Sequence, residues 1–485
     1  MEFPLKKQMK KSAVKFNKSA VLNAVKSVLS SRFFPFLTAA VVLTCYYLGW
    51  DLVIFYYIAA AGILMLLLLD DVSPIIGVFL FMNVMISRKN SPSSTVNASN
   101  YYSQTANVVQ IIVIISLFVL AVFYRVVLTG AKRKFKPTPI FYGLCVLAVA
   151  FVMNGVASAE YDLKNLAYGV FMAFFFLVIF TLMKDNVTPS KATFERIAWA
   201  FIALSVLLLI ELTVAYLKYG VIKDGHFYRT KLMFGWGIYN TMGMLLVFCI
   251  PSAAYLAGKY KYGFPFTVYA FVLFVASFFS LSRQAMLGAA VIYPVCTVIL
   301  LVKGKNMITN LLITAACLIA CIVVLGLKQD VLLDYIIKTF KALFVDGELN
   351  GNGRMEIYRA AVNNFKSAPV FGTGFFVEIP GAANFVGLSI IPARYHNTFL
   401  QMLGACGALG ITAYGVHRVQ TIICYFKNLT VERTLIALTV CSLLLVSLFD
   451  NHMFNLLPTL VYSSLIAVLV KSQPKEKPEK QALAQ

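Results

Sequence analysis

Charged side chains are scarce in this sequence. Asp, Glu, Lys and Arg make up 13% of its 485 residues, whereas 60% are hydrophobic and the mean hydropathy is +0.80. A soluble domain carries about a quarter charged residues, and the apolar excess here is too large for one core to bury. The composition therefore excludes a soluble globular protein, even as a separate domain, and predicts a chain that lies in lipid.

The sequence also lacks the patterns of a metal or disulfide site. None of its nine cysteines forms a CxxC pair, and all lie within or beside apolar runs. Cys317 and Cys321 are one helical turn apart and, like the others, are typical of small buried hydrophobes. The only adjacent acidic pair is Asp70-Asp71. We therefore expect no metal site and no cofactor.

The net charge of +22 would suit a nucleic-acid partner, but the distribution of the charge does not. Most Lys and Arg residues lie in short stretches between apolar runs and are not gathered on one domain. This pattern is typical of membrane topology and not of phosphate tracking along a duplex. The expected partner is the lipid bilayer, with no nucleic acid.

Apolar runs long enough to cross a bilayer recur along the whole chain. A spanning helix needs about 20 mostly apolar residues, with a lower limit of about 17. The sequence predicts an all-α polytopic membrane protein of about fourteen transmembrane helices, the third being the shortest. Their expected starts lie near Phe34, Leu52, Ser73, Asn107, Ile140, Leu166, Ile197, Asn240, Phe264, Ala285, Ile308, Asn397, Thr434 and Met453.

The basic residues predict the orientation of these helices. The first 32 residues carry eight basic residues against the single acid Glu2, which places the N-terminus in the cytoplasm. Alternation from there places inside the loops that hold residues 132–136, Lys259 and Lys303, as well as Arg418 with Lys427. The basic tail lies inside too, so both termini are expected in the cytoplasm.

The same reading divides the chain into five parts and leaves three longer segments outside. The outside segments are Arg88–Ala106, Lys218–Tyr239 and the longest, Lys328–Tyr395, in which apolar residues from Leu333 to Phe344 recur at helical spacing and predict a helix on the outer interface. The parts are a basic N-terminus (1–32) with an amphipathic helix near 14–29, transmembrane helices 1–11 (33–327), a large, partly helical extracytoplasmic loop (328–396), helices 12–14 (397–471) and a basic tail (472–485).

Four elements with polar groups fall on the outer side of this topology. Arg283, in the segment 281–288, lies at the outer mouth of a helix. Gly353-Arg354 opens an expected helix that ends near Phe365 and is followed by a turn at 371–374. The other two elements are Tyr395-His396-Asn397 at the next helix start and Tyr228-Arg229 with Lys231 before the helix start at Asn240.

Such groups suit a lipid-linked diphosphate. An arginine fork binds phosphate oxygens through paired, charge-assisted hydrogen bonds, and helix N-termini add positive potential. A histidine can take a proton from a sugar hydroxyl. The arginines would then hold the diphosphate and stabilise the charge on the leaving group, while the histidine activates the acceptor.

Each of these residues also has a structural interpretation. Taken alone, Arg283 is more typical of an anchor that reaches to the headgroups, and His396 of an interfacial histidine bonded to a loop carbonyl. We interpret Arg359 and Lys366 as solvated charges and His417 as structural, whereas His452 is a candidate for a second site residue. For Glu211, inside an apolar run, a structural hydrogen bond is favoured over a proton relay, because a buried carboxylate is costly.

The ordered series of motifs resembles the O-antigen ligase and polysaccharide polymerase family of polytopic membrane glycosyltransferases. It consists of Ser282-Arg283, Gly353-Arg354, Gly372-x-Gly374 and His396-Asn397 with later glycines, together with the helix start at Asn240. The resemblance covers roughly residues 228–410. The spacing from His396 to Gly407 departs slightly from one common form of the family's histidine motif.

The resemblance implies a function and roles for single residues. Glycan would pass from undecaprenyl diphosphate to an acceptor glycan or glycolipid at the outer face of a bacterial cytoplasmic (inner) membrane, without a metal ion and with inversion of the anomeric centre. His396 matches the proposed base of the family, Arg283 and Arg354 match its diphosphate-binding arginines, and Arg229 is a looser match. Possible supporting residues are Lys231, Tyr395, Asn397 and Arg394.

Two other classes of function remain open at this point. A flippase or transporter of a lipid-linked oligosaccharide would also have many spans, and it predicts ionisable residues near mid-membrane, for which Glu211 is the chief candidate. A purely structural membrane scaffold would leave the long outside loop unexplained.

Overall fold

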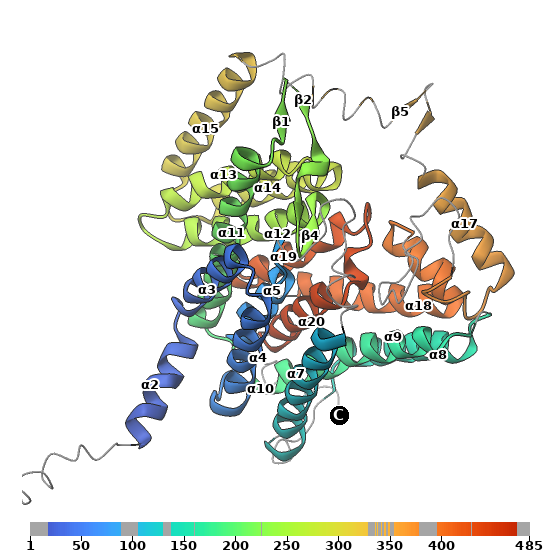
Figure 1. The fold of residues 1–485 in the computed structure, drawn as a ribbon. Coiled ribbons are helices and arrows are strands. Elements are labelled where there is room, and N and C mark those ends of the chain that lie inside the picture. Colours follow the sequence, from blue (N-terminus) through green and yellow to red (C-terminus); the bar gives the residue numbers. More distant parts are fainter. Residues whose placement is uncertain are drawn as a thin grey trace, which may run out of the picture.

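The described part of the chain is mainly helical, as the composition predicts, and contains three short hairpins (Figure 1). Arg394 and much of the expected outer-interface helix lie outside the residues that can be described. The structure, a computed structural model, describes residues 18–88, 105–129, 137–159, 161–224, 226–327, 354–377, 395–427 and 429–472, together with 335, 337, 341, 344–345 and 348–349.

Helices account for most of the described residues. In chain order they are α2 (Lys18–Ser30), α3 (Phe34–Leu48), α4 (Asp51–Leu68), α5 (Ile75–Phe81), η1 (Met82–Val84), α7 (Thr105–Phe123), η3 (Tyr124–Thr129), α8 (Pro139–Ala157), α9 (Leu163–Ala173), η5 (Phe174–Val178), α10 (Ile179–Asn186), α11 (Lys191–Lys218), η6 (Arg229–Lys231), α12 (Tyr239–Lys259), α13 (Phe264–Phe279), α14 (Arg283–Lys303), α15 (Met307–Leu327), α17 (Arg354–Ser367), α18 (Thr398–Phe426), α19 (Val431–Val446), η8 (His452–Phe454) and α20 (Leu456–Lys471).

The strands are two residues long and form antiparallel pairs. The pairs are β1 (Ile222–Lys223) with β2 (His226–Phe227), β3 (Met233–Phe234) with β4 (Gly237–Ile238), and β5 (Phe344–Val345) with β6 (Glu348–Leu349).

Several helices begin at side chains that cap their first turn. Ser190 accepts a hydrogen bond from the Thr193 backbone at the start of α11, and Asn397 accepts two at the start of α18. These side chains satisfy N–H groups that the first turn of a helix leaves without partners. At the other end of α3, Gly49 adopts a left-handed conformation with φ of 77°, which closes the helix at little steric cost.

Nine helical segments of the described chain are long and apolar enough to cross a membrane, and up to ten if α2 and α3, bent by 77°, form one span. Each of the fourteen expected segments contains a helix, but fourteen spans are not confirmed. The reason is length, since α3 has 15 residues, α13, α19 and α20 have 16 each and α5 only seven. At 1.5 Å per residue, 16 residues extend for about 24 Å, less than the hydrocarbon core of about 30 Å.

The segment that contains α5 nevertheless runs the length of α11. Before α5, Asp71 pairs with Arg196 at the start of α11 at 2.7 Å. After α5, the guanidinium of Arg88 lies 3.5 Å from the ring centroid of Tyr219 at the end of α11. A short helix continued by less regular backbone therefore connects the two ends of the bundle.

The two ends of the helical bundle differ in character. At one end, which we call the basic end, α12, α14 and α20 finish at Lys259, Lys303 and Lys471. Glu195 there pairs with Lys259 at 2.6 Å and with Arg32 at 3.6 Å. The opposite end, which we call the site end, holds the starts of α12, α14 and α18 and the turn after α19.

Candidate active site

The turn between α19 and η8 is the centre of the site end. Each of five consecutive residues in this turn contacts a different group. The backbone oxygen of Ser447 accepts a hydrogen bond from Thr398, that of Leu448 from Asn397, and that of Phe449 from Arg354. The Asp450 side chain contacts both His396 and Asn240. The Asn451 side chain donates to Gln401. The turn therefore joins the start of α18, the start of α17 and the start of α12.

His396 and Asp450 form a pair within this centre. The Nδ1 atom of His396 lies 3.0 Å from Oδ1 of Asp450, and the two side chains are 30% and 5% exposed. A buried carboxylate that accepts the Nδ1–H bond fixes the imidazole tautomer. The lone pair of His396 then lies on Nε2, on a ring that solvent and substrate can still reach.

Asp450 is itself held by Asn240 and the residues around it. The Nδ2 atom of Asn240 donates to Oδ2 of Asp450 at 3.1 Å, while its Oδ1 accepts from the Ser282 hydroxyl at 2.9 Å. The Asn451 backbone N–H donates to Oδ1 of Asp450 at 2.9 Å. Three donors thus converge on this carboxyl group, an arrangement that favours its ionised form.

His452 has a different environment from His396. It is 1% exposed, and its Nε2 lies 2.6 Å from Nε2 of Gln284. The Gln284 amide also donates to the backbone oxygen of Asn240 at 3.2 Å, which identifies the Gln284 nitrogen as the donor. The same Nε2 atom of His452 lies 3.8 Å from Oδ2 of Asp450. His452 is a buried residue that packs near Asp450, and its side chain is not exposed to a substrate.

Arg283 lies within electrostatic range of the other two predicted arginines. Arg229 and Arg354 both repel the charge of Arg283 electrostatically. Arg354, the first residue of α17, donates from Nη1 to the Phe449 oxygen at 2.5 Å, and the Arg229 guanidinium lies 5.5 Å from the Tyr239 ring centroid. Such cations repel one another, so their arrangement favours an anion between them.

Tyr358, one turn after Arg354 in α17, interacts electrostatically with Arg354 and with Asp450. Burial raises the pKa of Tyr358, Asp450 raises it further, and Arg354 opposes both. This phenol therefore stays neutral at physiological pH and can donate or accept a hydrogen bond beside the arginines.

Backbone conformation marks two of the helix starts. Leu281, just before Ser282-Arg283, has φ of 58°, and His396 has φ of 52°. Residues other than glycine avoid this left-handed region, at a cost of about 1–3 kcal/mol each, and those that adopt it gather at functional sites. The two positions aim the Arg283 and His396 side chains at the same end of the bundle, where three helix N-termini add positive potential.

The expected supporting residues have varied surroundings. Tyr395 is buried, and its hydroxyl accepts from Asn364 of α17 at 2.6 Å. Asn397 caps α18 and donates to the Leu448 oxygen at 3.0 Å, so both residues brace the site. Lys231 is exposed beside Arg229, and no described contact ties its side chain to the arginines.

The Gly372-x-Gly374 turn is part of the scaffold. α18 is kinked at Gly407, where φ is 63°, and the turn packs into the kink. The backbone N–H groups of Thr373 and Gly374 donate to the oxygens of Gly404 and Ala405 at 3.2 and 3.0 Å. Because these N–H groups are already bonded, the turn does not cradle a phosphate. Figure 1 shows α17, which the turn follows, beside α18.

The remaining ionisable candidates lie elsewhere. Arg359 and Lys366 are exposed on α17. His417 is fully buried and lies 2.8 Å from the hydroxyl of Tyr462. Glu211 is 2% exposed and accepts a hydrogen bond from the Trp236 indole at 2.9 Å, as the structural interpretation of this residue predicts.

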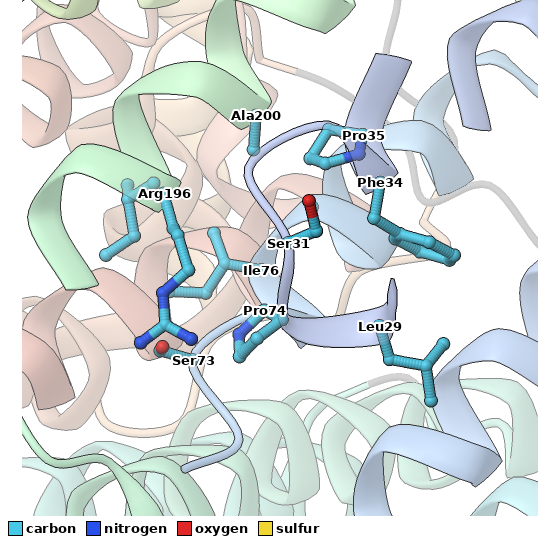
Figure 2. A pocket seen from close by; sticks show the side chains of 11 residues that line it. Leu29, Ser31, Phe34, Pro35, Ser73, Pro74, Ile76, Arg196 and Ala200 are labelled. Atoms are coloured by element: carbon cyan, nitrogen blue, oxygen red, sulfur yellow. The ribbon is translucent and has the colours of Figure 1, made fainter. Parts of the chain in front are cut away.

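A small pocket lies far from these groups, at the basic end. Leu29, Pro35, Ser73 and Arg196 are among the residues that line it, between α3, α5 and α11 (Figure 2). Its volume of about 10 Å³ admits no more than a water molecule. The pocket therefore has no part in binding a glycan.

Asp450 is the main site residue that the sequence does not reveal. It follows an apolar run in the triplet Asp450-Asn451-His452, and such a polar triplet between two apolar helices is the signal that could have drawn attention to it. Only the fold brings it to His396, since no spacing rule relates two residues so far apart in the chain.

The helices and the cationic, histidine-containing site end together define a multi-pass membrane protein with a polar site at one end of its bundle. Residues 268–415, which run from α13 into α18, match the family model described as O-Antigen ligase. The chain thus contains an O-antigen ligase family domain and is a membrane protein of the O-antigen ligase or polymerase type. The family implies a glycosyltransferase with lipid-linked glycan substrates. No curated protein matches the chain.

The matched segment contains some of the site but not all of it. Arg283, Arg354 and His396 lie within it, whereas Arg229 and Asp450 lie outside. The flanking helices therefore complete the site around the family domain.

Proposed function

We propose that the chain transfers or polymerises glycan from an undecaprenyl-diphosphate-linked donor onto an acceptor sugar hydroxyl. The observation that carries the proposal is the pairing of His396 with buried Asp450 at 3.0 Å, together with Arg283, whose charge Arg229 and Arg354 both repel. A general base beside a polycationic anion site suits sugar transfer from a diphosphate.

The proposed step begins with the donor diphosphate on Arg283, Arg354 and Arg229. Nε2 of His396 takes the proton of the acceptor hydroxyl as that oxygen attacks the anomeric carbon. The bond from this carbon to the phosphate oxygen breaks, and the diphosphate departs with the bonding electron pair. Asp450 stabilises the imidazolium that forms, as a buried carboxylate does for a histidine base.

A single displacement of this kind inverts the anomeric centre. The leaving group gains negative charge, which the arginine forks stabilise through charge-assisted hydrogen bonds. Arginines in this position serve the role that a divalent cation has in other transferases, and the proposed reaction is therefore metal-independent.

We place this site on the outer face of a bacterial cytoplasmic membrane, with both termini in the cytoplasm. The support is the contrast between the two ends of the bundle. Lys259, Lys303 and Lys471 finish helices at the basic end, and short cytoplasmic loops are enriched in Lys and Arg. With the basic end in the cytoplasm, the site end faces outward, where the acceptor glycan or glycolipid would lie.

The test uses the purified protein in liposomes that contain the lipid-linked glycan. Product formation should be lost in His396→Ala and in Arg354→Ala, while Arg359→Ala, an exposed neighbour on the same helix, should keep the wild-type rate. Wild-type product formation by His396→Ala would refute the proposal. Movement of the lipid-linked glycan across the bilayer with no new glycosidic bond would favour a flippase.

A further inference from the structure

The hairpin β3–β4 stands between two parts of the site. η6, which holds Arg229, precedes it, and Tyr239, the first residue of α12, follows it directly. The hairpin pairs Met233 with Ile238 and Phe234 with Gly237, and this reversal brings the Arg229 guanidinium onto the Tyr239 ring at 5.5 Å. The position of the hairpin therefore determines the positions of Arg229 and Asn240.

The buried carboxyl group of Glu211 forms a hydrogen bond with this hairpin. The loop residue Trp236 donates from Nε1 to Oε2 of Glu211 at 2.9 Å. Its ring also stacks on Phe234 with 5.0 Å between centroids and 15° between planes. Glu211 is 2% exposed and lies in α11, seven residues before its end at Lys218. Glu211, a residue of membrane helix α11, thus accepts a hydrogen bond from the tip of the hairpin.

Residues Ser87 and Arg88, from the N-terminal part of the chain, also contact this hairpin and the residues before it. A Cβ atom on Gly235 would lie 2.0 Å from the backbone oxygen of Ser87, so the loop rests directly on the backbone there. Ser87 is fixed in turn, because its N–H donates to Oδ1 of the buried Asp51 at 2.9 Å. Arg88, stacked on Tyr219, donates to the Lys231 oxygen at 3.5 Å.

The chemistry at Glu211 indicates a neutral carboxyl group. Its Oε1 atom is buried and has no hydrogen-bond partner among the described residues, and no cation pairs with the group there. An ionised carboxylate in that position would lose its hydration for a single hydrogen bond. The group therefore acts through its carbonyl oxygen, as an acceptor that a glutamine amide can replace.

We propose that the Glu211–Trp236 bond is a latch, and that Glu211 is a positioning residue for the transferase site through hairpin β3–β4. The path continues from the hairpin through Asn240, whose Nδ2 donates to Asp450, to His396. This inference rests on the proposed function, and it gives Glu211 a role other than proton transport. The latch lies outside the segment 268–415 that matches the family.

Kinetics of the purified full chain test the latch. In Glu211→Leu and in Trp236→Phe, we expect kcat to fall by about tenfold, since a displacement of about 1 Å at a catalytic constellation can cost up to about 10²-fold. Glu211→Gln should restore kcat to within about twofold of the wild type, because its amide oxygen still accepts the indole bond. The double variant Glu211→Leu/Trp236→Phe should be no slower than either single variant, since both remove one interaction.

The chain offers a matched control at the opposite end of the bundle. Trp199 donates from its indole to the Tyr260 hydroxyl at 3.3 Å, so Trp199→Phe removes a similar bond far from the hairpin and should leave kcat unchanged. A Glu211→Gln variant as slow as Glu211→Leu would overturn the latch and indicate a need for the acid proton. So would wild-type kcat in both Glu211→Leu and Trp236→Phe.

A second readout separates the latch from the reaction itself. The chain has three tryptophans, so Trp50→Phe/Trp199→Phe leaves Trp236 as the single fluorophore. In that background Glu211→Leu should shift the emission to longer wavelength and increase quenching by iodide, whereas Glu211→Gln should not. Unchanged emission in Glu211→Leu would overturn the latch even if the enzyme is active. A clear shift in a chain with no transferase activity would instead refute the proposed function and leave the latch standing.

Discussion

His396 and Asp450 are 54 residues apart in the chain, and their Nδ1 and Oδ1 atoms lie 3.0 Å apart in the fold. The carboxyl group is nearly buried, whereas the imidazole is 30% exposed. Burial strengthens the electrostatic effect of the carboxylate on the ring, and exposure leaves the ring open to an acceptor. The pair thus has the form of an oriented general base.

Asp450→Asn should lower kcat by about 10²-fold or more, the scale of a general-base contribution. An amide can still accept the His396 N–H, but its NH₂ group would face the Nδ2 donor of Asn240, and the negative charge is lost. KM for the donor should change little. Initial rates with the purified protein check this, with Asp71→Asn, paired with Arg196 at the basic end, as the control. A wild-type kcat in Asp450→Asn would contradict the assigned role.

Arg283→Lys and Arg354→Lys should each raise KM for the lipid-linked donor by about tenfold, which corresponds to about 1.4 kcal/mol. Lysine keeps the charge but lacks the planar fork that binds two phosphate oxygens. Titration of the donor in the transfer assay measures the effect. Arg196→Lys, at the basic end, should leave KM unchanged, and equal donor KM values for all three variants would count against a diphosphate site.

Gly407→Ala should destabilise the protein by about 1–3 kcal/mol, the cost of a strained backbone position. The residue has φ of 63°, and an added Cβ would lie 2.6 Å from the backbone oxygen of Val370. Thermal unfolding in detergent measures the loss. Gly415→Ala, farther along the same helix and with nothing within 4 Å of its Cβ, is the matched control. A rise in donor KM without a fall in stability would point to a phosphate-binding role for the glycine turn instead.

Removal of divalent cations should leave the transfer rate unchanged, since the proposed leaving group is stabilised by Arg283, Arg354 and Arg229. Dialysis of the purified protein against EDTA, followed by initial-rate measurements with and without added Mg²⁺ or Mn²⁺, tests this. A metal-dependent glycosyltransferase assayed in parallel confirms that the chelation works. A tenfold fall that the metal reverses would contradict the proposed mechanism.

The sequence predicted the helix starts at Asn240, Arg283, Arg354 and Asn397 to within a residue or two. These starts follow from local chemistry, in which an apolar run begins after a polar or capping side chain. The sequence also predicts that the three arginines and His396 lie on one side of the membrane, because alternating spans carry every second loop to the same side. The number of spans was harder to predict, since five of the fourteen helices are shorter than the hydrocarbon core is thick.

Other features depended on contacts between distant segments. Asp450 gained its place only when the turn after α19 met the starts of α12, α17 and α18. The sequence predicted a turn at Gly372, but not that the backbone N–H groups of Thr373 and Gly374 bond to the kinked part of α18. From the sequence, Glu211 is only a carboxyl group whose burial in an apolar run is unfavourable. The indole that donates a hydrogen bond to it belongs to a hairpin residue, 25 positions away in the chain.

The sequence by itself determined that this chain lies in lipid and where many of its helices start, because hydropathy and capping act over a few residues. The tertiary structure decided which side chains meet. The partners of His396, Arg354 and Glu211 are set by how helices pack, and packing depends on the shapes of surfaces that no local pattern records.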